Sequence, residues 1–267
     1  MSAFQGSSDS FSHDLKDKNF FIIKVGTNSI MQGADINRAF LTELVYEVAM
    51  LAKDGKKVVI VTSGAVGLGK RKLSFASSKN LSIVEQQGLA AIGQMALMKE
   101  YMTRFDSLGV ECAQVLISQH DFKNESCRAN IKNTFAFLME NNVVAIVNEN
   151  DVVATEELKQ NGVFSDNDAL AALLAKQLNA DLLVMLTSKN GLIGKDGAVL
   201  KLFESKNQLL KMKKNSNDGR GGIDSKLESI EKAISCGCDI FVSGQDCFKG
   251  FSEGKSAGTY IAAKRRY

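Results

Sequence analysis

The feature that most constrains the fold is the regular alternation of short apolar runs with helix-patterned segments. Residues 20–25 and 57–62 are runs dominated by Val, Ile and Phe side chains. Between them, residues 35–53 place apolar side chains at helical spacing, with Asp35 as the expected N-cap and Gly55 beyond the end. Runs that are apolar on both faces are typical of strands in a parallel sheet. We therefore predict an α/β fold, with a mostly parallel central sheet covered by helices on both faces.

The same alternation continues to the end of the chain. Further strands are expected at 109–117, 143–147, 181–186, 239–242 and 258–262, helices at 82–105, 126–140 (capped by Ser126), 166–178 and 224–236, a hairpin near 191–200 and a polar loop at 215–222. Residues 1–18 lack this pattern and are expected to form a mobile tail, which leaves residues 19–267 as one domain. No linker rich in Gly or Ser divides that domain.

Composition argues against several classes of function. The 267 residues are 45% hydrophobic and 24% charged, and the net charge of +3 is too small to predict nucleic-acid binding. The apolar runs have the length of strands, so we expect no membrane span. The N-terminus lacks the apolar segment of a secretory signal, and its acidic residues disfavour a mitochondrial presequence. Five scattered cysteines favour free thiols, and two histidines are too few for a histidine-based metal site, so we expect a cytoplasmic protein without a resident metal.

Proline is absent from the chain. An average usage of ~5% would give about 13 prolines in a chain of this length, yet the count is 0. The requirements of an α/β fold do not explain this absence.

Polar segments follow four of the predicted strands. In a parallel sheet the carboxyl ends of the strands meet at one edge, and ligands bind beyond that edge. The segments at residues 26–29, 63–69, 148–151 and 187–191 all stand in this position. We therefore predict that they contribute to one site.

Three basic or glycine-rich segments are candidates for anion binding. Lys24 lies inside a predicted buried strand, where an ammonium needs either a protein carboxylate or a ligand phosphate. The segment VTSGAVGLGK starts a helix near Ser63, and it is either an anion site formed by backbone N–H groups or a plain turn. The segment NSNDGRGGIDSK, residues 215–226, is either a phosphate loop or a flexible surface loop. Neither segment has the spacing of a dinucleotide fingerprint or a P-loop.

Two acidic segments favour binding of an amino acid. In FSDNDALAALLA, capping of the following helix accounts for two of residues 166–168. Capping does not account for residues 148–151, the sequence NEND, which follow a buried strand. Carboxylates suit a ligand ammonium, and amides suit a ligand carboxylate.

Taken in order, the motifs resemble those of a known family. IIKVGTN, VTSGAVGLG, AAIGQMALM, VNENDVVATEEL, SDNDALAALLA, LLVMLTSKNGL and GRGGIDSKLES stand in this order over about residues 20–262. This chain is similar to the glutamate 5-kinases of the amino acid kinase family. NEND, DND and the AIGQ helix are specific to these kinases, whereas the Lys-Gly and Ser-Gly-Ala elements are shared by the wider family. The resemblance implies an α/β/α sandwich that phosphorylates the γ-carboxylate of L-glutamate with ATP, giving γ-glutamyl phosphate, the first step toward proline.

The resemblance also implies roles for individual residues. Lys24 and Lys226 would contact the phosphates, Asp168 would organise the two lysines, and Asp151 would receive the substrate ammonium. The implied substrate-binding positions are Ser63, Gly64, Ala65, Asn150, Asp151, Asp166 and Asn167. The implied ATP-binding positions are Lys24, Gly26, Thr27, Thr187, Ser188, Arg220, Gly221, Gly222, Ile223, Asp224, Ser225 and Lys226. Residues 19–175 would bind glutamate and residues 176–267 would bind ATP.

The resemblance further implies Mg²⁺ accompanying ATP, feedback inhibition by proline and assembly into dimers or tetramers. The chain departs from the family at Ser165, Ser188 and the Arg220 to Ile223 loop, and we expect it to lack the RNA-binding-like C-terminal domain of many bacterial members. Kinases for N-acetylglutamate, aspartate, carbamate or UMP, and a non-catalytic sensor of amino acids or nucleotides, are alternatives. A proline-free enzyme of proline synthesis could still be translated when proline is scarce; deliberate redesign and chance drift are alternative explanations for the missing prolines.

Overall fold

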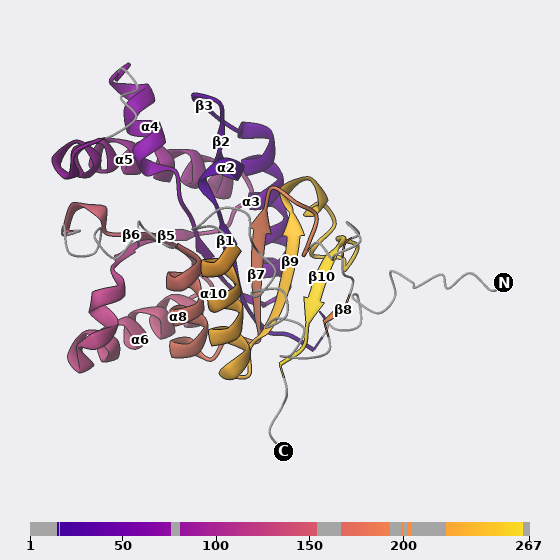
Figure 1. Ribbon diagram of the computed structural model, residues 1–267. Helices are drawn as coiled ribbons and strands as arrows, with labels where there is room; N and C mark the ends of the chain where they lie inside the picture. Colours follow the sequence, from indigo (N-terminus) through magenta and orange to yellow (C-terminus); the bar gives the residue numbers. More distant parts are fainter. Residues whose placement is uncertain are drawn as a thin grey trace.

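The computed structural model describes residues 15, 17–75, 81–153, 167–192, 199, 202–203 and 223–263. Eight described strands form one sheet in the order β5-β6-β4-β1-β7-β9-β10-β8 (Figure 1). Their bounds are β1 Phe20–Val25, β4 Lys57–Val61, β5 Cys112–Ile117, β6 Val144–Glu149, β7 Leu182–Thr187, β8 Leu202–Phe203, β9 Asp239–Gly244 and β10 Gly258–Ile261. The six strands from β5 to β9 in this order are mutually parallel, and β10 runs antiparallel to β9.

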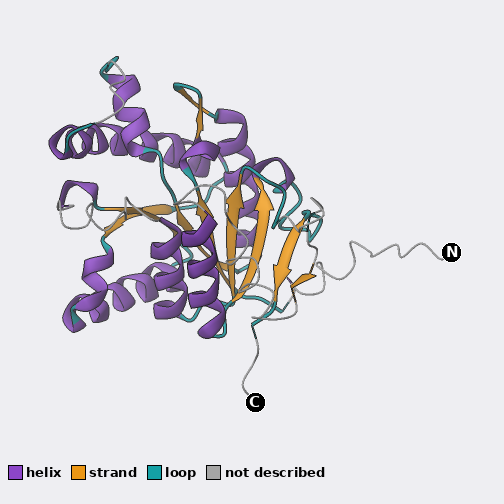
Figure 2. Cartoon of the chain, in the orientation of Figure 1, coloured by secondary structure: helices purple, strands orange, loops and turns teal. Residues whose placement is uncertain are grey.

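Helices cover both faces of the sheet, which confirms the predicted fold class (Figure 2). One face carries α3 (Arg38–Lys53) and α5 (Ile83–Ser107), with α2 (Thr27–Ile30) and α4 (Ala65–Lys72) at its edge. The other face carries α6 (Glu125–Glu140), α8 (Asn167–Leu178) and α10 (Ile223–Ser235). Shorter pieces are the hairpin β2 (Met31–Gln32) and β3 (Asp35–Ile36), and the 3₁₀ turns η1 (Gln119–Lys123), η2 (Asp151–Val153) and η3 (Gln245–Cys247). In the described part of the chain, no helix is both long and apolar enough to cross a membrane.

The alternation of side chains along β1 determines which face of the sheet its one charged side chain points toward. Phe21, Ile23 and Val25 pack on the α3–α5 face, and Phe20 and Ile22 pack on the α8 face. Since side chains alternate between faces along a strand, the residue after Ile23 points toward α8. That residue is Lys24, which is buried although it is charged.

Two predicted helix caps were wrong. Helix α3 begins at Arg38, and Asn37 caps it by accepting a hydrogen bond from the Phe40 N–H at 3.2 Å. The expected cap, Asp35, belongs instead to the β2–β3 hairpin. Likewise α6 begins at Glu125, one residue before the expected cap Ser126, because the Asn124 side chain accepts from the Cys127 N–H. The residue that caps the helix lies two positions after the expected one in α3 and two positions before it in α6.

The chain is anchored before residue 19. Leu15 and Lys18 are both buried, although the sequence assigned them to a tail. The Lys18 ammonium pairs with the Asp239 carboxylate, which also accepts hydrogen bonds from the Tyr260 hydroxyl at 2.6 Å and the Ala263 N–H at 2.7 Å. Because Asp239 begins β9, this cluster lies at the amino edge of the sheet, away from the predicted site. The predicted loop at 215–222 and most of the hairpin near 191–200 lie outside the described residues.

Candidate active site

The carboxyl ends of β1, β4, β6 and β7 meet at one edge of the sheet, as the parallel register requires. The helices that begin beyond this edge are α2 after β1 and α4 after β4, and η2 follows β6. Helix α10 leads into β9, which is parallel to β7, so α10 also begins at this edge and runs toward the other. The predicted polar segments that the structure describes therefore share one edge.

A buried ion pair joins β1 to α8. The Lys24 Nζ atom lies 2.6 Å from Asp168 Oδ1, and each side chain is 10% exposed. Asp168 stands in the first turn of α8, so a helix start and a strand end bring the two charges together. A Cβ atom at Gly26 would lie 3.4 Å from the Lys24 Nζ atom, so glycine keeps the space beside the ammonium open. The Lys24 ammonium therefore has a protein carboxylate as its partner, which is one of the two alternatives expected from the sequence. The pair lies at the edge of the sheet where the site is predicted.

The amide of Asn167 bridges α8 to the end of β4. Its Nδ2 group donates a hydrogen bond to the Thr62 carbonyl oxygen at 2.7 Å and another to the Ser63 hydroxyl. Its Oδ1 atom is buried and has no hydrogen-bond partner among the described residues. A buried acceptor without a donor is costly in a native protein, and a bound ligand is one common source of the donor.

The turn after Ser63 requires glycine. Gly64 has a φ of +101° and stands immediately before helix α4, and a Cβ atom there would approach Ile30 Cγ2 to 3.0 Å. Helix α4 then crosses α5 at very short range, since a Cβ atom at Gly93 would lie 1.7 Å from the Ala65 carbonyl oxygen. The start of α4, and with it the first-turn N–H groups, is fixed by this contact.

The end of β6 is held by an amide pair that the sequence did not predict. The Asn148 Nδ2 group donates to Gln94 Oε1 at 2.8 Å, and Asn148 Oδ1 accepts from the Glu149 N–H at 2.9 Å. Both amide side chains are buried, and Gln94 Nε2 has no hydrogen-bond partner among the described residues. One signal was available: Gln94 stands in the same helical stripe as Ala90, Leu97 and Tyr101, where every other member is apolar or aromatic.

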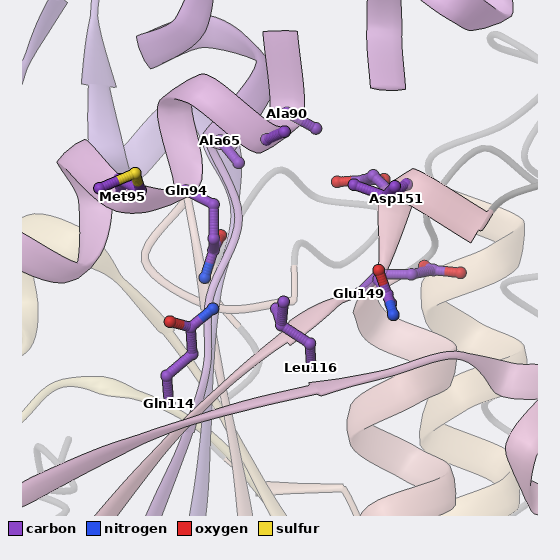
Figure 3. A pocket seen from close by; sticks show the side chains of 11 residues that line it. Ala65, Ala90, Gln94, Met95, Gln114, Leu116, Glu149 and Asp151 are labelled. Carbon is purple, nitrogen blue, oxygen red and sulfur yellow. The ribbon is translucent and has the colours of Figure 1, made fainter. Parts of the chain in front are cut away.

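A cavity of about 260 Å³ opens between α5, β5 and the end of β6 (Figure 3). The Gln94 side chain points from α5 toward Gln114 on β5, and Asp151 lies at another part of the rim. Of the predicted substrate-binding residues, Ala65, Asn150 and Asp151 line it. Asp151 begins η2 and is half-buried, and this burial raises its pKa. A carboxylate held partly out of water, beside amides and apolar walls, suits a small ligand with an ammonium group.

The predicted nucleotide positions are described only in part. Gly26 and Thr27 start α2, and Thr187 ends β7, where its hydroxyl accepts from the Lys189 N–H at 3.1 Å. Ser188 is exposed. Residues Ile223, Asp224, Ser225 and Lys226 form the first turn of α10, and their side chains lie outside the described part of the structure. Asp166, Arg220, Gly221 and Gly222 also lie outside the described residues.

The known proteins that this chain resembles agree with the family that its sequence motifs indicate. The profile of the amino acid kinase family matches residues 19–243. The chain is 37% identical over 255 residues to the glutamate 5-kinase of Thermotoga maritima, covering 92% of this chain and 69% of the relative. It is 37% identical over 231 residues to the glutamate 5-kinase of Enterococcus faecalis, covering 83% of this chain and 85% of the relative. Among solved structures, the carbamate kinase of Giardia lamblia matches with a TM-score of 0.65 and 17% identity, over 92% of this chain and 99% of that one, which shows a shared fold.

Proposed function

Because the chain belongs to the amino acid kinase family and, within it, to the glutamate 5-kinases, we propose that it phosphorylates the γ-carboxylate of L-glutamate with ATP. The products are γ-glutamyl phosphate and ADP, and the reaction is the first step toward proline. The observation that best supports this proposal is the meeting at one edge of the Lys24–Asp168 pair and the polar residues that follow β6.

The chemistry needs charge neutralisation more than proton transfer. A glutamate carboxylate has a pKa of about 4.3 and is already ionised at neutral pH, so no general base is required. One oxygen of this carboxylate forms a bond to the γ-phosphorus of ATP while the bond to the β,γ-bridging oxygen breaks, and ADP departs with that electron pair. Such a transfer depends on in-line placement of two anions and on cover for their charge.

Lys24 supplies one of the cationic groups. Asp168 holds the Lys24 ammonium in place, and the two charges stabilise each other in the absence of substrate. A phosphate arriving beside the ammonium would share it with Asp168. Lys226, in the first turn of α10 at the same edge, is the proposed second cation on the phosphates.

The polar residues after β6 are the proposed recognition site for the amino-acid end of glutamate. Asp151 accepts the substrate ammonium, and Asn167 Oδ1 is a buried acceptor within the same edge. Gln94 Nε2 is a buried donor that can meet a carboxylate. We propose that glutamate binds to residues 19–175 and that ATP binds largely to residues 176–267.

Magnesium enters as the ion of the MgATP co-substrate. Across the described residues, no group of three or more His, Cys, Asp or Glu side chains is placed to hold a metal ion, and Asp168 is paired with Lys24. Mg²⁺ retains much of its water and is commonly bound through substrate phosphates. We further propose a cytoplasmic homo-oligomer, a dimer or tetramer, in which proline inhibits at or near the glutamate site.

The test is formation of γ-glutamyl hydroxamate from ATP, Mg²⁺, L-glutamate and hydroxylamine. We expect turnover that requires all four components, is lost in Lys24→Met and is kept in the exposed-lysine control Lys132→Met. ADP release with N-acetylglutamate, aspartate, carbamate or UMP in place of glutamate separates the sibling kinases. Binding of glutamate and ATP without any turnover would instead identify a sensor.

A further inference from the structure

The hydroxyl of Tyr101 lies in the core of the α3–α5 face, and Tyr101 stands seven residues after Gln94 on α5. It is 2.9 Å from the Thr62 Oγ1 atom, and both side chains are fully buried. The pair joins helix α5 to the residue that directly follows β4. A buried tyrosine hydroxyl is usually hydrogen-bonded, so the contact alone would be ordinary core structure.

Thr62 links the two layers of the molecule. Its side chain faces α5 and Tyr101, while its carbonyl oxygen accepts the hydrogen bond of Asn167 Nδ2 from α8 at 2.7 Å. Its own N–H donates to the Val147 carbonyl oxygen at 2.8 Å, which continues the β4–β6 pairing. One residue therefore receives a contact from each helix layer and from the neighbouring strand.

The Thr62 carbonyl decides which way the Asn167 amide faces. A carbonyl oxygen can only accept, so the NH₂ group of Asn167 must point at it. The Asn167 Oδ1 atom is then turned away from Thr62, and this is the buried acceptor left without a partner among the described residues. Movement of Thr62 would release the amide to rotate and would remove that acceptor from its place.

From these contacts we propose that Tyr101 is a positioning residue for glutamate binding. Its hydroxyl holds Thr62, Thr62 orients Asn167, and Asn167 presents Oδ1 to the donor group of the substrate. Burial also raises the pKa of Tyr101, so the hydroxyl stays protonated and neutral across the working pH range. The inference rests on the proposed function and adds to it a residue that does not touch the substrate.

The test is a double-mutant cycle on the glutamate KM. Tyr101→Phe and Thr62→Val each remove one hydroxyl with little change of shape, and each should raise the glutamate KM by about five-fold, the effect of one lost hydrogen bond. Because both remove the same contact, the double variant should show about the same five-fold increase rather than the product of the two. The ATP KM should stay unchanged. Thr62→Ser keeps the hydroxyl and should retain the wild-type KM.

The matched control is Tyr46→Phe, a half-exposed tyrosine on the neighbouring helix α3, which should change neither constant. Thermal unfolding of each variant shows whether it folds, and calorimetric glutamate binding replaces KM for any variant that is folded but slow. The inference is wrong if the increases in glutamate KM of the two single variants multiply in the double variant. It is also wrong if the variants lower the Tm and leave the glutamate KM unchanged. Wild-type protein without hydroxamate activity would instead contradict the proposed function, and glutamate binding would then still test Tyr101.

Discussion

The Lys24 ammonium lies 2.6 Å from the Asp168 carboxylate, with 10% of each side chain exposed. Asp168→Asn keeps the shape of the side chain and leaves a buried, unpaired ammonium. We expect the unfolding free energy to fall by roughly 3–5 kcal/mol, the usual cost of breaking a buried ion pair from one side. We expect kcat to fall about 100-fold, as for loss of one preorganised electrostatic group.

Combining Lys24→Met with Asp168→Asn separates the effect on stability from the effect on activity. Chemical denaturation measures the first effect, and steady-state kinetics measure the second. The double variant has no buried unpaired charge, so its stability should return toward the wild-type value while its activity stays lost. A double variant that remains as unstable as Asp168→Asn would mean that the two side chains act separately.

The Asp151 carboxylate should lower the stability of the folded state at neutral pH. Burial raises its pKa above the ordinary value of ~3.9. The folded protein therefore binds this proton more tightly than the unfolded chain does, so stability falls as the pH rises through the raised pKa. At neutral pH Asp151→Asn removes this penalty and should raise the Tm, and the difference should vanish below the ordinary pKa.

The same substitution should weaken glutamate binding. Removing a charge that pairs with the substrate ammonium should raise the glutamate KM by roughly 30-fold or more, and leave the ATP KM unchanged. In the wild type, kcat/KM for glutamate should fall as the pH drops through the raised pKa, because the carboxylate is then protonated. Asp246→Asn, at an exposed position in η3, is the matched control for both measurements. An equal change in both KM values would exclude Asp151 as the ammonium site.

Replacement of two glycines of α5 by alanine should have opposite effects on the free energy of unfolding. A Cβ atom at Gly93 would lie 1.7 Å from the Ala65 carbonyl oxygen, so Gly93→Ala must push α4 away from α5. We expect a loss of about 3 kcal/mol or more of unfolding free energy, since overpacking of a rigid contact is destabilising. Ala65 lines the cavity, so the glutamate KM should rise as well.

Gly88→Ala on the same helix is the internal comparison. Gly88 is exposed, and apart from its own stretch of helix no described residue lies within 4 Å of a Cβ atom placed there. Alanine there should stabilise the helix by up to ~1 kcal/mol without changing either KM. Similar Tm shifts for the two variants would show that helix propensity, and not the contact with α4, accounts for the result.

Whether a feature of the site can be predicted from the sequence depends on how far apart in the chain the interacting residues lie. The apolar runs of β1, β4, β6 and β7, and the polar residues after them, follow from local periodicity and were predicted. The β2–β3 hairpin has two-residue strands, too short to show a period, so the start of α3 was misplaced. The Gln94–Asn148 and Tyr101–Thr62 contacts join residues 54 and 39 positions apart. They depend on how α5 crosses the sheet, which the close contact between Gly93 and Ala65 of α4 constrains and no local pattern reveals.

The absence of proline predicts behaviour during proline starvation. The chain contains no proline, so its synthesis draws no prolyl-tRNA from the pool that its proposed pathway supplies. A proline-containing control is available at Glu125, the first residue of α6. Proline is well tolerated at the first position of a helix, and Asn124 before it has φ −92° and ψ 127°, which a following proline accepts. Glu125→Pro should therefore fold and act like the wild type.

Expression in a proline auxotroph compares the two chains directly. With proline supplied, immunoblots should show equal amounts of wild type and Glu125→Pro. After proline is withdrawn, newly made wild type should continue to accumulate while Glu125→Pro stops, because each variant chain needs one proline. Since this measurement counts protein and not turnover, it is independent of the kinase assay. If accumulation of both chains falls equally, another step limits synthesis under starvation, and the missing prolines give the enzyme no advantage there.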